Sequence, residues 1–259
     1  MKALITGASS GIGRDMARYL AELGYDLIIV ARRKDLLEQL KKDLKTEVKI
    51  VCMDISNLEN SRQLFEENKE IDILINNAGF GDFGKFDETD LQKELSMIDT
   101  NIKSLHTLTK LYLPEMKKKN TGHILNVASI AGFMAGPLMA TYYATKNYVV
   151  SLSKAIQKEL KKDKSSVNVS VLCPGPVNTN FDDVANVKFK LKSLSSEYVA
   201  RYAIDKMLKN KTVIIPGKEM KLVYIGNKLS PSSLSLELAY HSQKRKSNRQ
   251  KGSKNENTK

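Results

Sequence analysis

The feature that most limits the fold of this chain is a regular alternation of short apolar segments with segments of helical period, starting at the first residues. The apolar segments are rich in Ile, Val and Leu and lack two-residue alternation, which is typical of parallel strands covered by helices on both faces. They lie at residues 2–6, 26–31, 48–53, 71–75, 122–128, 167–172 and 212–215. The pattern predicts an α/β fold: a single doubly wound Rossmann-type domain, with three αβα layers and a mainly parallel seven-stranded sheet.

The segments between these predicted strands place their apolar residues at helical spacing. Ile12, Met16 and Leu20 share one helix face after the first strand. Residues 90–119 carry a longer apolar stripe, which predicts one long helix whose stripe faces the core or a second subunit. No internal repeat and no Pro- or Gly-rich linker in the sequence indicates a second folded domain.

The positive charge of the chain is concentrated at its C-terminal end. The formal net charge is +13, and residues 244–259 hold seven Lys or Arg against one Glu, a net +6. Because this segment also lacks apolar periodicity, it is predicted to be a disordered tail. It either solubilises the chain or makes weak contact with a membrane surface or nucleic acid. Specific nucleic-acid binding is disfavoured, since aromatic residues (7% of the chain) are dispersed and no basic helix presents a reading face.

Cysteine and histidine usage indicates neither disulfides nor a metal site. Cys52 and Cys173 both fall in predicted strands and are expected to be buried, reduced thiols. His106, His123 and His241 are too scattered along the sequence to predict a metal site. The sequence enters a strand pattern at once and contains no apolar run of about 18 residues, so we expect a cytoplasmic protein without a transmembrane segment.

A glycine-rich loop, Thr6-Gly-Ala-Ser-Ser-Gly-Ile-Gly13, joins the first predicted strand to the first predicted helix. Gly7, Gly11 and Gly13 leave room for a dinucleotide pyrophosphate to approach the unpaired N–H groups at the start of that helix. The spacing differs from the common G-x-G-x-x-G fingerprint, and glycines at such a junction also serve turn geometry alone. The loop alone is therefore weak evidence for a dinucleotide site, and the prediction depends on further motifs in the sequence.

Further motifs follow the fourth, fifth and sixth predicted strands. They are Asn76-Asn-Ala-Gly79, then Ser129 with Tyr142-Tyr-Ala-Thr-Lys146 beginning 13 residues later, and Pro174-Gly-Pro-Val-Asn-Thr179. Together with the glycine loop they resemble the motifs of the short-chain dehydrogenase/reductase family, in its compact NADP-preferring branch, over residues 6–179. The resemblance implies an oxidoreductase that interconverts a ketone or aldehyde and an alcohol by hydride transfer with a nicotinamide cofactor.

The resemblance also implies four catalytic residues. Transfer of a hydride to a carbonyl carbon leaves charge on oxygen, so a proton donor must lie beside that oxygen. Tyr142 is the predicted acid and base, and Lys146, at i+4 on the same helix face, is expected to lower its pKa from about 10. Ser129 is expected to hydrogen-bond the substrate oxygen and, by resemblance, Asn101 to keep a water in line with Lys146. Tyr143 is the competing candidate for the proton donor, because it too shares a face with Lys146.

The other cofactor contacts come from the same resemblance. Asp54, after the third strand, is expected to meet the adenine amino group, with Ile55 beside it; the alternative is a helix-capping carboxylate. The full predicted cofactor-binding set comprises Gly7, Ser9, Ser10, Gly11, Ile12, Gly13, Arg32, Arg33, Asp54, Ile55, Asn77, Ala78, Gly79, Tyr142, Lys146, Pro174, Gly175, Val177 and Thr179.

The end of the second predicted strand indicates which dinucleotide is bound. A ribose 2′-hydroxyl calls for Asp or Glu at this point, whereas a 2′-phosphate calls for cations. The sequence has Ala31-Arg32-Arg33 with no acid, which favours NADP(H). Arg32 is the stronger candidate, and Ser9 is expected to add a hydroxyl. Arg33 and Lys34 are alternatively no more than the solvated start of a helix.

The resemblance divides the chain by role. Residues 1–217 are expected to form the dinucleotide-binding domain with the catalytic site, 218–243 an amphipathic segment packed near the substrate pocket, and 244–259 the basic tail. Residues 180–195 carry apolar side chains beside alternating lysines, which fits a lipophilic carbonyl substrate, such as a 3-oxoacyl or steroid-like ketone, or a lid whose lysines face water. The resemblance also implies a homodimer or homotetramer, because the helices at 90–119 and 141–161 match the family's usual subunit contact. The competing function is a non-catalytic protein that binds or senses NADP(H).

Overall fold

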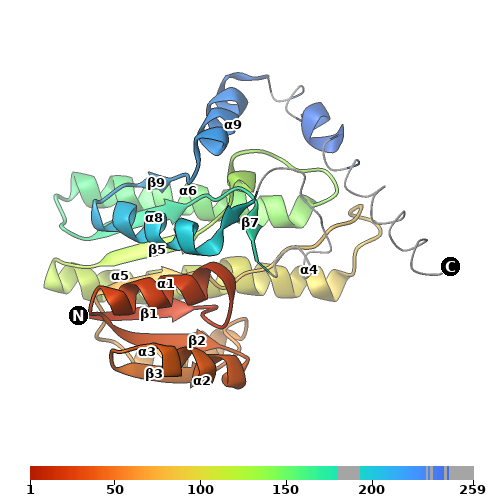
Figure 1. Ribbon diagram of the computed structural model, residues 1–259. Helices are drawn as coiled ribbons and strands as arrows, with labels where there is room; N and C mark the ends of the chain where they lie inside the picture. Colours follow the sequence, from red (N-terminus) through yellow and green to blue (C-terminus); the bar gives the residue numbers. More distant parts are fainter. Residues whose placement is uncertain (180–192, 232, 234–235, 242–243, 245–259) are drawn as a thin grey trace.

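One parallel sheet forms the centre of the molecule (Figure 1). The computed structural model describes residues 1–179, 193–231, 233, 236–241 and 244. The sheet is built from β1 (Lys2–Thr6), β2 (Asp26–Ala31), β3 (Val48–Cys52), β4 (Ile73–Asn76), β5 (His123–Val127), β6 (Asn168–Leu172) and β9 (Val213–Ile214). Its order is β3-β2-β1-β4-β5-β6-β9, and all six neighbouring pairs are parallel. The predicted Rossmann-like α/β fold is confirmed, with a wholly parallel sheet where a mainly parallel one was expected.

Helices cover both faces of the sheet, which explains why its strands are apolar without alternation. On β1, Ile5 packs with α1 (Gly11–Glu22), α2 (Lys34–Asp43) and α8 (Ser196–Leu208), whereas its neighbour Leu4 packs with α3 (Leu58–Glu66), α5 (Leu105–Lys119) and α6 (Ala140–Lys162). Because successive strand side chains point to opposite faces, each position of a strand covered on both sides must be apolar.

The long helix expected at residues 90–119 is interrupted. It consists of α4 (Leu91–Ile98), a π-helical turn η1 (Asp99–Ser104) and α5. Leu91 and Leu95 at its start are exposed, and Leu105 and Leu108 beyond the π-turn are buried in the core. The apolar stripe is therefore not one continuous packed face. Its break falls at Asn101, one of the predicted catalytic residues.

The C-terminal part of the described chain adds small elements beside the sheet. β7 (Val177–Asn178) pairs in parallel with β8 (Leu194–Ser195), on the two sides of residues 180–192, which lie outside the described part. Helix α9 (Lys218–Leu229) follows the edge strand β9 and stands at the margin of the molecule (Figure 1). It contacts the short helix η2 (Ile130–Phe133) through Tyr224, whose ring centroid lies 4.6 Å from that of Phe133.

The two cysteines differ in burial. Cys173 is buried as expected, but Cys52 is exposed, because it ends β3 at the edge of the sheet, and its Sγ donates to the Arg32 carbonyl at 3.3 Å. The expectation of a buried Cys52 was wrong. Within the described residues no helix is long and apolar enough to cross a membrane. The same part of the chain contains no group of three or more His, Cys, Asp or Glu side chains arranged to hold a metal ion.

Candidate active site

The predicted site motifs gather at one edge of the sheet. Each follows the carboxyl end of a strand, and because the strands are parallel these ends lie on the same side. β1 and β4 are neighbours, yet the chain proceeds from β1 toward β2 and from β4 toward β5, in opposite directions along the sheet. Such a reversal opens a crevice at the carboxyl ends of the strands, where open α/β sheets bind their ligands.

The glycine loop is shaped so that side chains are excluded from it. Gly7 and Gly11 have φ angles of +66° and +54°, a left-handed conformation that favours glycine. A Cβ atom at Gly7 would lie 2.8 Å from the Ala78 Cα, and one at Gly13 would collide with the Asn77 side chain. Gly7 is therefore required both by its left-handed φ and by the nearby Ala78 backbone, Gly11 by its left-handed φ, and Gly13 by the close approach of Asn77 and the Gly7 carbonyl.

Asn77 holds the glycine loop against the end of β4. Its Nδ2 donates to the carbonyl oxygens of Thr6 at 3.0 Å and Gly7 at 3.2 Å. In return the backbone N–H groups of Asn77 and Ala78 donate to the Thr6 hydroxyl at 3.0 and 3.1 Å. The Asn-Asn-Ala-Gly motif thus fixes the shape of the loop that would carry the pyrophosphate.

The start of α1 fits an anion. Ser10 is its N-cap, but the Ser10 hydroxyl accepts a hydrogen bond from Arg33 at 3.0 Å, not from the helix. The first N–H groups of a helix carry partial positive charge and lack intrahelical acceptors, so an uncapped start binds phosphate readily. With the glycine cradle, these residues fit the diphosphate of a dinucleotide. Ile12, on the first turn, packs partly into the core instead of facing the loop mouth.

Ser129 and Tyr142 form a hydroxyl pair next to the loop. Ser129 ends the β5 segment and caps η2, accepting the Ala131 N–H at 3.2 Å. Tyr142, on the first turn of α6, is buried, and its hydroxyl is hydrogen-bonded to the Ser129 side chain. Burial raises the pKa of Tyr142 above its ordinary value, and the hydrogen bond to Ser129 opposes that rise only in part.

Lys146 lies one helical turn beyond Tyr142 and is also buried. Its Nζ donates to the Val127 carbonyl at 3.0 Å and lies 5.8 Å from the Tyr142 ring centroid. Burial lowers the pKa of Lys146 to about 8. The expectation that Lys146 lowers the pKa of Tyr142 is therefore not met in this structure, because the ammonium is turned to a carbonyl and the phenol is held away from water.

Asn101 is buried in the π-turn and clamps the backbone of Phe80. Its Oδ1 accepts the Phe80 N–H at 3.1 Å, and its Nδ2 donates to the Phe80 carbonyl at 2.9 Å and to the Thr145 hydroxyl at 3.1 Å. A Cβ atom at Gly79 would lie 2.8 Å from the Asn101 Oδ1 and 3.4 Å from the Lys146 Nζ. The Asn101 amide and the Lys146 ammonium therefore both lie close to Gly79, on the side of the site that also holds Tyr142. Thr145, which ties α6 to this cluster, was not predicted, although it lies within the Tyr142–Lys146 motif.

The two arginines after β2 have different partners. The Arg33 Nη2 donates to the hydroxyls of Ser9 and Ser10, each at 3.0 Å, and so lies on the glycine loop. The Arg32 Nη1 lies 3.6 Å from the Asp54 Oδ2. The ranking of Arg32 ahead of Arg33 as a cofactor contact stays a prediction; in this structure the chain turns at Arg33, the N-cap of α2, and it is the Arg33 guanidinium that lies over the loop.

Asp54 does not cap a helix, since Asn57 is the N-cap of α3. The Asp54 Oδ1 accepts from the backbone and hydroxyl of Ser56 at 3.0 and 2.8 Å. Partial burial would raise the pKa of Asp54, but the Ser56 hydrogen bonds and the charge of Arg32 together lower it. Its carboxylate is thus ionised near the end of β3. Its neighbour Ile55 is buried in the core, so only its backbone is available to a ligand.

The loop after β6 reaches back to the glycine loop. The Pro174 carbonyl accepts the Ile130 N–H at 2.9 Å, beside Ser129, and Gly175 lies against the Met220 side chain. Farther along, Val177 is buried in the core. A Cβ atom at Gly11 would lie 3.0 Å from the Thr179 Cγ2. The loop therefore connects the hydroxyl pair with the pyrophosphate cradle.

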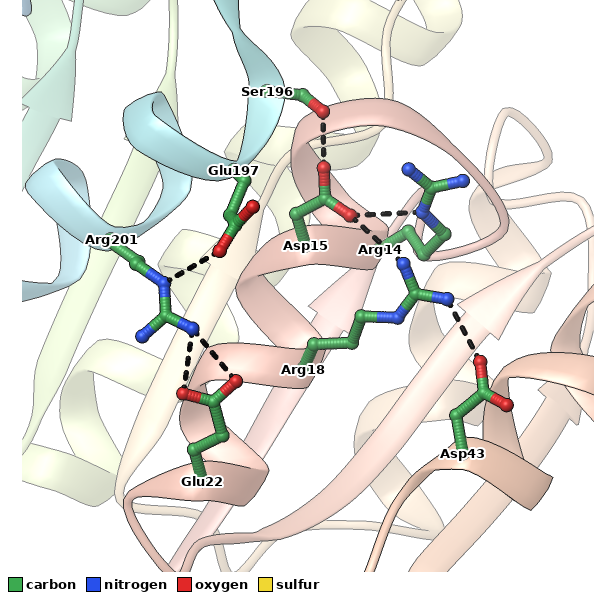
Figure 2. Close-up of polar contacts among 8 residues, drawn as sticks. All are labelled: Arg14, Asp15, Arg18, Glu22, Asp43, Ser196, Glu197 and Arg201. Atoms are coloured by element: carbon green, nitrogen blue, oxygen red, sulfur yellow. Dashed lines mark hydrogen bonds and ion pairs between the residues drawn. The ribbon is translucent and has the colours of Figure 1, made fainter.

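A polar network anchors α8 to α1 where the described chain resumes (Figure 2). The Ser196 hydroxyl donates to the buried carboxylate of Asp15, which also receives the Arg14 Nε at 3.0 Å. Farther along the same helices, the Arg201 Nη2 lies 2.8 Å from the Glu22 Oε2. Sequence analysis missed Asp15, because an acid beside arginines on a helix has the pattern of a solvated pair. Its hydrogen bond with Ser196 ties the start of α8 to the first turns of α1, the helix that follows the glycine loop.

The Rossmann-like fold, the glycine cradle and the hydroxyl pair define a class of dinucleotide-binding oxidoreductases, and the comparisons identify the family. The sequence matches the family model of short chain dehydrogenases over residues 1–188. An uncharacterized oxidoreductase of Staphylococcus epidermidis is 33% identical over 181 residues, which cover 68% of this chain and 78% of the relative. One from Staphylococcus saprophyticus is 36% identical over 186 residues, with the same coverage. The chain belongs to the short-chain dehydrogenase/reductase family.

Solved structures agree with this assignment. A short-chain dehydrogenase from Sphingobium yanoikuyae in complex with NADPH has a TM-score of 0.77 at 29% identity, covering 84% of this chain and 88% of its own. One from Burkholderia phymatum in complex with NAD has a TM-score of 0.77 at 26% identity, covering 86% and 91%. Because these two neighbours hold different dinucleotides, the likeness leaves the choice of cofactor to the residues of this chain.

Proposed function

We propose that this protein is an NADP(H)-dependent oxidoreductase that interconverts a ketone or aldehyde and an alcohol, with Tyr142 as the general acid and base. The observation that carries the proposal is the buried hydroxyl pair of Ser129 and Tyr142, with Lys146 one turn away, beside a side-chain-free cradle. The arrangement supports the proposal, because reduction of a carbonyl needs a proton donor and a hydrogen-bond donor beside the same oxygen.

A nicotinamide dinucleotide, when bound, supplies or accepts the hydride. During reduction Ser129 hydrogen-bonds the substrate oxygen and Tyr142 gives it a proton, so that negative charge does not build up on the oxygen. In the reverse direction Tyr142 takes the proton of the alcohol. Lys146 supplies a positive charge on the same helix face, which stabilises the phenolate once it forms. Since burial raises the pKa of Tyr142, the phenol is protonated at neutral pH, and this state favours reduction.

The preference for NADP(H) rests on the charges after β2. The segment Ala31-Arg32-Arg33 has no acid to receive a ribose 2′-hydroxyl. Arg33 and the hydroxyls of Ser9 and Ser10 form a compact donor cluster that suits a 2′-phosphate. Arg32 shares its charge with Asp54 and is the weaker contributor. Among the neighbours, the Sphingobium yanoikuyae enzyme was solved with NADPH and a serine dehydrogenase with NADP+.

Replacing Arg33 by alanine is expected to weaken NADPH binding by about 10- to 100-fold, as for the loss of a charge-assisted hydrogen bond. NADH binding should change little, because NADH has no 2′-phosphate. Arg32→Ala serves as the matched control and is expected to have a smaller effect. Fluorescence titration of both dinucleotides measures the dissociation constants. A wild-type protein that binds NADH more tightly than NADPH contradicts the assignment.

A turnover screen tests the proposed reaction as a whole. The loss of NADPH absorbance is followed with small ketones, quinones, 3-oxoacyl thioesters and steroids, and turnover of a lipophilic ketone is expected. This expectation comes from the apolar residues of the segment 180–195, which are Phe181, Val184, Val187, Phe189 and Leu191. These five residues lie outside the part of the chain that the structure describes. A flat screen with confirmed NADPH binding favours a cofactor-binding or sensing protein instead.

A further inference from the structure

Helix α9 carries apolar residues on two opposite faces. Its inner face packs on the body of the protein: Met220 is buried, Tyr224 stacks on Phe133, and the Asn227 Nδ2 donates to the Phe133 carbonyl at 2.7 Å. These three residues are spaced by four and three positions, which is one helix face. This inner face is therefore the one through which α9 packs on the rest of the protein.

The outer face of α9 consists of Leu222, Ile225 and Leu229. Their exposed fractions are 69%, 50% and 80%, and their spacing of three and four positions makes one continuous stripe. With 100° between successive residues, this stripe lies opposite the face that holds Met220 and Tyr224. A surface helix normally presents polar residues there, so an exposed aliphatic stripe indicates a surface that binds something.

Lysines border one side of the outer face, where Lys221 and Lys228 lie, and the Lys221 Nζ is also 5.8 Å from the Tyr202 ring centroid. α9 carries Lys218, Lys221 and Lys228 against one acid, Glu219. In the sequence as a whole, residues 218–259 hold ten Lys or Arg against three Glu, a net +7 out of +13. An aliphatic stripe flanked by lysines suits the boundary between acyl chains and anionic headgroups, because lysine stems lie along apolar surface while their ammonium groups reach the headgroups.

We infer that the outer face of α9, together with the basic C-terminal residues, docks the protein on a membrane surface that contains anionic lipid. A second copy of the chain is the less suitable occupant, because joining two such faces would bring together two helices that each carry three lysines against one glutamate, a net +2. α9 stands at the margin of the molecule beside the last strand of the sheet, where a flat surface can reach it (Figure 1).

Docking through α9 would place the membrane close to the candidate active site. The inner face of α9 touches Gly175 through Met220 and η2 through Tyr224, and these elements border Ser129. A carbonyl compound dissolved in the bilayer would then reach the site from the membrane. This consequence rests on the proposed function, whereas the docking itself does not.

Sedimentation of the full chain with vesicles tests the docking. Vesicles with about 30% phosphatidylglycerol should bind the protein at least about tenfold more strongly than pure phosphatidylcholine, and high salt should weaken that binding. Changing Leu222, Ile225 and Leu229 together to Gln should reduce binding by about tenfold or more. Deleting residues 245–259, a net +5, should do the same. The matched control changes two exposed leucines elsewhere, Leu23 and Leu58, to Gln.

The sequence contains no tryptophan, so a single introduced one reports its surroundings without background. Ile225→Trp should shift its fluorescence to the blue with anionic vesicles, and Leu58→Trp should not. Three outcomes overturn the proposal: the full chain does not sediment with anionic vesicles, the triple variant binds them like the wild type, or the triple variant changes only the oligomer size in gel filtration. The last result would make the outer face a subunit contact. NADPH turnover measured in parallel tells a failure of docking from a failure of the proposed reaction.

Discussion

Tyr142→Phe is expected to lower turnover by about 10²- to 10⁴-fold while NADPH still binds. The substitution removes one hydroxyl from a buried ring, and the ring itself fills the same space. What is lost is the proton that Tyr142 would give to the substrate oxygen and the hydrogen bond to Ser129. Steady-state turnover and NADPH titration of the same preparation separate the chemical step from cofactor binding.

Tyr143 provides a matched control on the same helix. Its ring centroid lies 6.1 Å from that of Tyr142 and its ring covers Gly136, so Tyr143 packs at the edge of the cluster in which Tyr142 is buried. Tyr143→Phe is expected to change turnover by less than about tenfold. A large loss in Tyr143→Phe with normal turnover in Tyr142→Phe would transfer the role of proton donor to Tyr143.

The fold could be predicted from the sequence because strands that are buried on both faces of a sheet are apolar at every position. Leu4 and Ile5 are adjacent in β1 and point to different helical layers, so the strand had to be apolar at every position. Glycines and polar residues then follow the strand ends, where the chain turns at the carboxyl edge. Local signals of this kind survive in a single sequence because they do not depend on which distant side chain becomes a partner.

The details of the site depend on partners that spacing does not determine. Arg32 and Arg33 are adjacent and identical, and only the start of α2 decides that the second one turns to Ser9 and Ser10. The π-turn that holds Asn101 adds one residue to a helical turn, and no Pro or Gly within it marks its position in the sequence. Likewise, i+4 spacing brought Lys146 near Tyr142 but did not show that its ammonium is bound by the Val127 carbonyl.

Replacing Lys146 by methionine is expected to remove activity and, at the same time, to change how stability depends on pH. Turnover should fall by about 10²-fold or more, since the phenolate of Tyr142 loses its neighbouring charge. In the free enzyme, however, the Lys146 ammonium is buried, which lowers its pKa to about 8. Removing a charge from this place relieves a desolvation cost, and it leaves the Val127 carbonyl without its donor, a loss of about 1–3 kcal/mol. At pH 7 the two effects oppose each other, so stability should change by no more than about 2 kcal/mol.

The pH dependence separates these effects. Unfolded, Lys146 titrates near its ordinary pKa of about 10.4, so between pH 8 and 10 the unfolded chain binds more protons than the folded one, whose Lys146 has a pKa of about 8. The lysine's contribution to stability therefore rises across this window by about 2 kcal/mol, and well below pH 8 its burial cost is present in full. Tyr142 and Cys173, whose pKa values burial raises, act in the opposite direction at high pH in both proteins, and because the Lys146 charge lowers the pKa of Cys173, its removal moves that pKa farther up. Urea unfolding of the free wild type and of Lys146→Met at pH 7 and 10 should thus show a difference that grows with pH in favour of the wild type. Lys158→Met, which removes an exposed ammonium from the same helix, is the matched control and should show no such growth. Parallel pH profiles of wild type and Lys146→Met would mean that Lys146 is not a buried charge, and its proposed role beside Tyr142 would then lack its physical basis.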